Sequence, residues 1–291
     1  MGEGIGYLLA AVATLAWGLI VLPVKRAGTP GRLGIGISML AGLAALAPLA
    51  PWWWPDAAGW RELFSWTGLS VLGAGICQAP LATIFYYEGA RVGEVSIVAP
   101  LTRTKIVFAA ALLSAFGLDT ITRNVAWACA AGVAGAAVMT WRPGLKGQAQ
   151  APVKGAGLAL LAALSWAAGD VLARRSVGRL PAMTVTFVSL ALGAAAYYIY
   201  MAARGETRAI FAMPLRDKLL YGLHGLVSFG LAYAAFYGSM KPIGAAKAVV
   251  ITAAWPGVSF VAGVAILGER ITPAKAAGFV LLALSVALAA W

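Results

Sequence analysis

Two cations, Arg103 and Lys105, stand within the apolar stretch EVSIVAPLTRTKIVFAAALLS, which runs from Glu94 to Ser114. A charge in the hydrocarbon layer is costly and needs a partner, water or a ligand. Side chains two residues apart on a helix differ by about 200°, so we expect at most one of them to point squarely into a central cavity. Either cation could contact an anionic group such as an amino acid carboxylate. Alternatively, one or both snorkel or pair with an acid from another helix.

Asp170 is the one acid that we expect inside a membrane span. It lies four residues before Arg174, a spacing that favours an ion pair near the helix end. The other interpretation is a proton site, because an acid in an apolar setting can load and release a proton. His224 is the only histidine. Without a cluster of ligands around it, a packed, hydrogen-bonded residue is favoured over a metal site, so we expect no metal and no cofactor.

Aromatic and amide side chains within the expected spans complete the candidate site. On a helix, Gln78, Ala82 and Phe85 form one stripe, and a tyrosine hydroxyl within a span needs a polar partner, which favours a face toward a cavity. An aromatic, partly polar cavity with a cation suits amphipathic organic solutes. The expected substrate-binding residues are Trp17, Gln78, Ala82, Tyr86, Arg103, Lys105, Trp166, His224, Tyr233 and Tyr237.

The elements that position these residues must be membrane helices. The chain has 291 residues, of which 62% are hydrophobic and 11% charged. Its mean hydropathy is +0.85. A span needs about 20 apolar residues, and the segment from Leu33 to Pro55 carries no charge. We therefore predict an all-α polytopic membrane protein. The ten expected spans are 4–25, 32–51, 66–90, 93–116, 122–141, 155–174, 181–203, 217–240, 243–267 and 271–290.

A formal charge of +12 would suggest nucleic-acid binding in a soluble protein. Here the cations lie mostly in short loops between apolar runs, which indicates membrane topology and lipid headgroup contact instead. We expect no nucleic-acid partner. Cys77 and Cys129 both fall within expected spans, where packing is favoured over a disulfide or a metal pair.

The two halves of the sequence resemble each other. GYLLAAVATLAW, ending at Trp17, resembles GAGLALLAALSW, ending at Trp166, at a spacing of 149 residues. FYYEGARVG from Phe85 resembles FYGSMKPIG from Phe236, at a spacing of 151. Because five spans is an odd number, the halves would cross the membrane in opposite senses. We predict two five-helix repeats, 1–145 and 155–291, joined by a linker at 146–154, around a central cavity.

These motifs resemble the drug/metabolite transporter superfamily. Trp17-Gly18 followed by Pro23 and Lys25, and GERIT from Gly268 to Thr272, are most similar to EamA-type exporters. The first half departs from this pattern, because Leu118-Asp119 follow Gly117 and Lys105 stands at the repeat position of Pro256. The resemblance implies a ten-helix secondary transporter in the bacterial inner membrane, with both termini in the cytoplasm. It also implies export of aromatic and neutral amino acids by alternating access. Because both inverted halves lie in one chain, we expect a monomer.

Loop charges and the resemblance disagree on orientation. Lys and Arg are more numerous on the side of the 146–154 linker than on the side of the termini. The positive-inside rule would therefore place the termini outside, although two opposed halves weaken that bias. We favour cytoplasmic termini, as the resemblance implies.

Three alternatives stay open. The nearest is an exchanger of anionic phosphorylated metabolites, which would use the cations of the cavity. An intramembrane enzyme is disfavoured, because the sequence lacks HExxH, a GxSxG with a histidine partner, and a P-loop. A channel is disfavoured because the pseudo-symmetry lies within one chain. Coupling through Asp170 or His224, and facilitated diffusion without protons, are both compatible with the sequence.

Overall fold

A computed structural model describes residues 2–24, 26–49, 54–93, 98, 101–140 and 152–291, which form helices and connecting turns without a strand. The expected repeat boundary at residue 145 and most of the expected linker, 146–151, lie outside these residues. The helices are α1 (Glu3–Val24), α2 (Gly31–Leu46), η1 (Ala47–Leu49), α4 (Ala57–Leu63), α5 (Trp66–Ile76), η2 (Cys77–Leu81), α6 (Ala82–Val92), η3 (Thr102–Thr104), α8 (Lys105–Ala115), α9 (Arg123–Thr140), α10 (Pro152–Val177), α11 (Ala182–Ala203), α12 (Thr207–Phe211), α13 (Leu215–His224), η4 (Gly225–Ala232), α14 (Tyr233–Ile243), α15 (Ala245–Thr252), α16 (Trp255–Leu267) and α17 (Pro273–Ala290).

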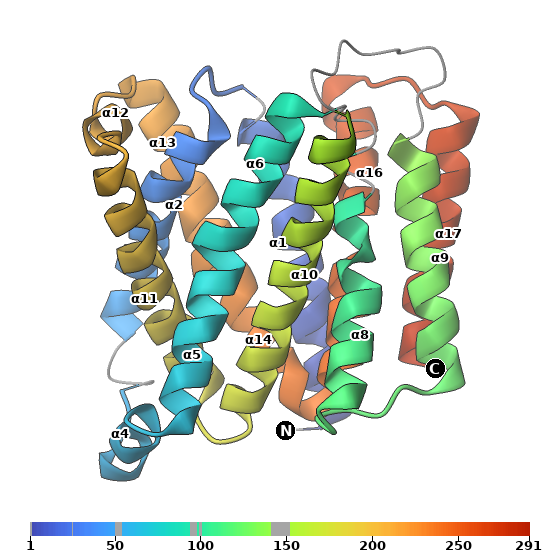
Figure 1. Cartoon of the computed structure of the whole chain (residues 1–291). Coiled ribbons are helices and arrows are strands. Elements are labelled where there is room, and N and C mark those ends of the chain that lie inside the picture. Colours follow the sequence, from blue (N-terminus) through green and yellow to red (C-terminus); the bar gives the residue numbers. More distant parts are fainter. Residues whose placement is uncertain (1, 25, 50–53, 94–97, 99–100, 141–151) are drawn as a thin grey trace.

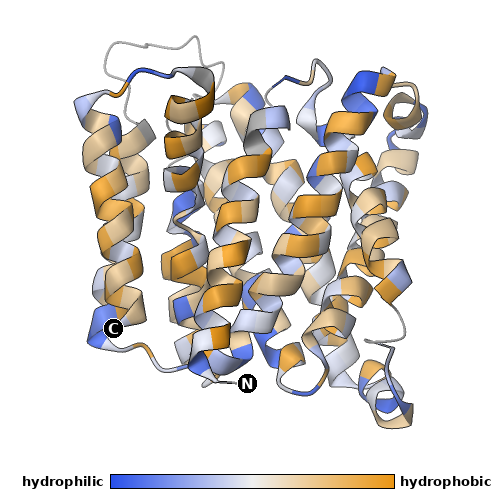
Figure 2. Ribbon diagram, turned by 180° about the vertical axis from the view of Figure 1, so that it is seen from behind, coloured by the Kyte–Doolittle hydropathy of each residue, from blue (hydrophilic) through white to orange (hydrophobic). Residues whose placement is uncertain are grey.

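The long helices stand side by side as a bundle, with both chain ends at the same end of it (Figure 1). Hydrophobic residues cover much of the outward faces, and hydrophilic residues gather toward the two ends (Figure 2). Within the described residues, eight helical segments are long and apolar enough to cross a membrane. The prediction of an all-helical, multi-pass membrane protein is confirmed.

Two of the ten expected spans are not among these eight. For 93–116 the structure describes the helix α8, which has 11 residues and begins only at Lys105. For 122–141 it describes α9, which has 18 residues and opens with the polar pair Arg123 and Asn124. α9 nevertheless packs along the apolar α17. A Cβ at Gly135 would lie 2.9 Å from the carbonyl oxygen of Gly278, so the two backbones touch where small residues allow it.

The GERIT motif forms the turn between α16 and α17. Gly268 ends α16 with a φ of 64°, a left-handed conformation that glycine adopts without strain. The Thr272 hydroxyl then accepts a hydrogen bond from the Lys275 amide at 3.3 Å and so caps α17. Glu269 pairs with the Lys275 ammonium group at 3.0 Å. The motif is thus explained by helix ending and capping.

Two membrane helices contain a π-helical segment at matching places. η2 lies between α5 and α6, and η4 lies between α13 and α14. Pro80 within η2 lacks an amide hydrogen, which removes one regular helical hydrogen bond. π-segments occur frequently at functional sites because they leave backbone groups available and rotate the side chains that follow.

Contacts between the halves are reciprocal. α10 packs against α5, α6 and α8, whereas α1 packs against η4, α14, α15 and α16. A Cβ at Gly75 would meet the backbone of Ser189 on α11. A Cβ at Gly225 would meet the backbone of Ser38 on α2, and Ser38 and Ser189 are 151 residues apart. These paired contacts support the five-plus-five inverted repeat, which we retain as a proposal.

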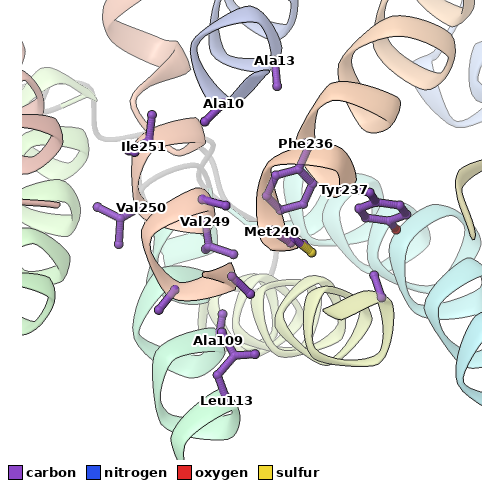
Figure 3. Packing of buried hydrophobic residues seen from close by; sticks show 14 of the residues in the cluster. Ala10, Ala13, Ala109, Leu113, Phe236, Tyr237, Met240, Val249, Val250 and Ile251 are labelled. Carbon is purple, nitrogen blue, oxygen red and sulfur yellow. The ribbon is translucent and has the colours of Figure 1, made fainter. Parts of the chain in front are cut away.

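Buried hydrophobic residues from several helices pack together in one core (Figure 3). It is built from small and branched residues, which let four helices approach closely. These buried residues include Ala10 and Ala13 of α1, Ala109 and Leu113 of α8, Met240 of α14, and Val249 of α15. The residues of the same helices that lie farther from the termini end, such as Trp17 and Lys105, instead border a cavity.

Candidate functional site

The cavity has a volume of about 390 Å³, within the usual range for small-molecule sites. Both halves of the chain contribute to its wall, which combines aromatic rings with a few polar and charged groups. Eight of the ten expected substrate-binding residues line it: Trp17, Gln78, Tyr86, Arg103, Lys105, Trp166, His224 and Tyr233. The packed core separates this space from the end of the bundle that carries the termini.

Arg103 lies at the junction of two interrupted helices. It belongs to the 3₁₀ turn η3, which precedes α8. Its guanidinium carbon lies 4.4 Å from the centre of the Trp255 ring, at the start of α16, where a turn at Ala253 and Ala254 separates α15 from α16. Among the described residues Arg103 forms no ion pair. A cation held by a ring, without a carboxylate, remains available to a ligand anion.

Lys105 has a carboxylate partner. Its Nζ lies 3.2 Å from Oδ2 of Asp170 on α10, and its side chain is 17% exposed, whereas that of Asp170 is fully buried. The other carboxylate oxygen of Asp170 accepts a hydrogen bond from the Gln78 side-chain amide. The Tyr233 hydroxyl donates to the amide oxygen of Gln78 at 3.2 Å. Four side chains from η2, α8, α10 and α14 thus form one polar network at the cavity wall, with Asp170 behind the other three.

Two expectations about these charges were wrong. Both Arg103 and Lys105 line the cavity, because the α-helix begins only at Lys105 and the preceding turn does not follow α-helical angles. Asp170 pairs with Lys105 and not with Arg174. The Nε atom of Arg174 is buried without a hydrogen-bond partner in the described structure. A partner from another helix was available in space, and the i, i+4 spacing could not reveal it.

Trp17 and Trp166 make matching hydrogen bonds across the bundle. The indole N–H of Trp17 donates to the Ser228 hydroxyl in η4 at 3.0 Å. The indole N–H of Trp166 donates to the backbone carbonyl of Gln78 in η2 at 3.1 Å. Each tryptophan of one half therefore anchors the π-segment of the other half, while its ring borders the cavity.

Aromatic rings in contact with one another line much of the cavity wall. Phe229 and Tyr233 stack with their centres 5.6 Å apart. Trp17 meets Tyr233 edge-on at 5.2 Å, and on the opposite side Tyr86 lies 6.0 Å from Trp166. Such contacts hold aromatic side chains in fixed positions, and the exposed faces can stack on a planar solute.

His224 reaches the cavity with one nitrogen engaged. Its Nδ1 lies 3.0 Å from the Ser38 hydroxyl oxygen. That hydroxyl donates to the Tyr221 carbonyl at 2.8 Å, so we infer that Nδ1 carries the proton and donates to Ser38. The lone pair then lies on Nε2, which is free to accept a hydrogen bond.

Ala82 and Tyr237 are not at the cavity surface. Ala82 is completely buried and Tyr237 is 1% exposed. The expected stripe assumed regular α-helix, but η2 widens the turn before Ala82, so Thr83 and Tyr86 face the cavity instead. Tyr237 borders a separate small pocket together with Ser189 of α11.

Several residues of the cavity wall were not predicted from the sequence, among them Trp255, Tyr87 and Ser228. Trp255 could have been predicted from the repeat. Trp255-Pro256 interrupts an apolar run 151 residues after Thr104-Lys105, so the repeat places it at the matching helix break. Tyr87 reaches the cavity because of the rotation of its helix, and Ser228 is placed by its hydrogen bond with Trp17. The sequence has no direct signal for either feature.

The second half of the chain matches a known protein family. Residues 153–291 match the EamA-like transporter family. A solved crystal structure resembles the chain with a TM-score of 0.78 and 21% sequence identity, covering 99% of this chain and 97% of that chain. At this identity the likeness shows the fold alone. No curated protein matches the chain.

Proposed function

We propose that this chain, an EamA-like membrane transporter of the drug/metabolite transporter superfamily, exports aromatic and neutral amino acids and related metabolites by alternating access. The family that matches residues 153–291 is described as a transporter family. The observation that carries the finer proposal is the cavity of about 390 Å³, which combines aromatic walls with Arg103, a cation without a carboxylate partner among the described residues.

In this proposal Arg103 binds the substrate carboxylate. A guanidinium group presents parallel N–H donors that match the two oxygens of a carboxylate. Nε2 of His224 is an acceptor for the substrate ammonium group, and the faces of Trp17, Trp166 and Tyr233 receive an apolar side chain. These roles use every chemical part of an aromatic amino acid.

Alternating access requires the hydrophobic core to open. The cavity and the core use successive parts of the same helices, so a rocking of one half against the other would expose the cavity at the termini end. The reciprocal glycine and serine contacts of α2, α5, α11 and η4 are the surfaces on which the halves would move. Because each chain carries both halves, we propose a monomer as the transporting unit.

We place the protein in the bacterial inner membrane with both termini in the cytoplasm. Both chain ends lie at one end of the bundle (Figure 1). A fluorescent protein fused after Trp291 is expected to fluoresce, whereas a fused periplasmic phosphatase is expected to stay inactive. The opposite pair of results would reverse this orientation and agree with the loop charges.

Asp170 remains the candidate for coupling to protons. It is fully buried, and Lys105 lies between it and the cavity. A proton could therefore reach the carboxylate only when Lys105 moves. Coupling of this kind would make exchange depend on a pH gradient, and facilitated diffusion would not.

The test is counterflow in proteoliposomes with two solute panels, neutral and aromatic amino acids and sugar or nucleotide phosphates. We expect exchange of amino acids and none of phosphates. Exchange of phosphates alone would overturn the proposal in favour of phosphorylated metabolites, for which two cations line the cavity. Running each assay with and without a pH gradient tests proton coupling in the same experiment.

A further inference from the structure

The charged side chains around the cavity do not contribute equally to its net charge. Among the described residues, the lining contains two basic side chains, Arg103 and Lys105. Asp170 is not part of the lining, yet its carboxylate lies 3.2 Å from the Lys105 ammonium group. The Gln78 side-chain amide donates to the other carboxylate oxygen of Asp170.

No other charged group from a neighbouring helix, among the described residues, changes the pairing of Asp170 with Lys105. Lys105 is the cation on α8. The other partner, Gln78, is neutral, and so is Tyr233, which donates to Gln78. Arg174 lies one turn away on the same helix but does not pair with it. Lys105 and Asp170 therefore cancel, and Arg103 supplies the one net positive charge among the described residues of the cavity wall.

We propose that Asp170 sets the charge of the transported solute: by neutralising Lys105, it leaves the cavity with one net positive charge and so selects a single carboxylate over a doubly charged phosphate. The inference rests on the proposed function in that it takes the cavity as the substrate site. It makes Asp170 a specificity residue that acts through Lys105 without touching the solute.

The physical reason is the cost of an unbalanced charge away from water. A single carboxylate bound at Arg103 is balanced by that cation, whereas a dianionic phosphate leaves one negative charge without a counter-charge. To balance a dianion, Lys105 would have to leave Asp170, and a buried carboxylate would then lose its cation. Both routes penalise phosphate.

The experiment compares two probes that share one aromatic ring, phenylacetate and phenyl phosphate, at pH 8, where the phosphate carries close to two charges. Binding to the purified full-length protein is measured for the wild type, Asp170→Asn, and the double variant Lys105→Gln/Asp170→Asn. The net charge at the cavity wall is +1 in the wild type, +2 in the single variant and +1 in the double variant.

We expect the wild type to prefer phenylacetate. Asp170→Asn should shift the ratio of affinities toward phenyl phosphate by about tenfold or more. The double variant should return the ratio to within about threefold of the wild type, because it restores the net charge with different residues. If Asp170→Asn does not fold, the comparison of wild type and double variant still tests the inference, since both carry the same charge.

A ratio that does not change in folded Asp170→Asn, or that stays shifted in the double variant, overturns the inference. So does a double variant that loses the preference for phenylacetate. If amino acids exchange normally in counterflow while the ratio of the two affinities does not change with the net charge of the cavity wall, the proposed function stands and this inference alone fails. Absence of binding of either probe in all three proteins, together with absent counterflow, overturns both.

Discussion

Replacing Arg103 with Gln is expected to reduce transport of amino acids about 100-fold, as measured by the initial rate of counterflow at low substrate concentration. In the structure this side chain has an aromatic partner, Trp255, and no carboxylate partner among the described residues. Glutamine keeps one N–H donor group but neither the charge nor the paired geometry. The substrate carboxylate would then enter the cavity without a counter-charge.

The matched control is Arg91→Gln. Arg91 lies in the last turn of α6, is 65% exposed at its side chain, and pairs with Glu88 at 2.7 Å on the surface. Its loss should change transport less than about twofold, because exposed ion pairs contribute little. Arg103→Lys should retain part of the activity, since it keeps the charge. Normal transport by Arg103→Gln, in protein that is folded, would remove this residue from the substrate site.

Introducing a branched side chain where the halves touch is expected to unfold the bundle at markedly lower temperature. Valine at Gly75 would meet the backbone of Ser189, and valine at Gly225 would meet the backbone of Ser38. Backbone atoms cannot move aside as a flexible side chain can, so each substitution must force two helices apart. We expect a loss of about 2 to 3 kcal/mol for each.

The measurement is thermal unfolding of the purified protein in detergent, compared with Gly157→Val. Gly157 lies on α10, and a Cβ there meets nothing within 4 Å. That variant controls for the change in helix propensity from glycine to valine. Equal melting temperatures for all three variants would contradict the close backbone contacts. A drop for only one of Gly75→Val and Gly225→Val would argue against the reciprocal packing.

Apolar run lengths were sufficient to predict the membrane class and most of the helices. A stretch such as Trp66–Val92 has too few charges to lie anywhere else, and the structure keeps it as one span of 27 residues. Two expected spans are not confirmed as spans. α9 is a continuous helix of 18 residues, but it begins with the polar residues Arg123 and Asn124. The expected span 93–116 lies partly outside the described residues, and its described part includes a 3₁₀ turn before α8.

Sequence repetition also located much of the candidate site. The match of Trp17 with Trp166 led to two side chains that border the cavity and anchor opposite π-segments. What repetition could not provide was helix rotation. The π-segment η2 turns Ala82 away from the cavity and brings Thr83 to it. The sequence alone does not show how such a segment rotates the side chains that follow it.

Partners from distant parts of the chain were the least predictable feature. Asp170 had a nearby arginine in the sequence, yet its partner is Lys105, 65 residues earlier. The pair forms because α8 and α10 pack together, which is a property of the assembled bundle. The identity of the free cation, and with it the proposed selectivity, follows from this tertiary contact.

The central claim is that the cavity is the substrate site, and protection of a cavity cysteine tests it most directly. Thr83 lines the cavity, and cysteine has nearly its size. In a background in which Cys77 and Cys129 are replaced by alanine, Thr83→Cys should react with a thiol reagent more slowly when a transported amino acid is present, and the labelled protein should stop exchanging. A labelling rate that does not change at saturating concentrations of a transported amino acid would contradict the account.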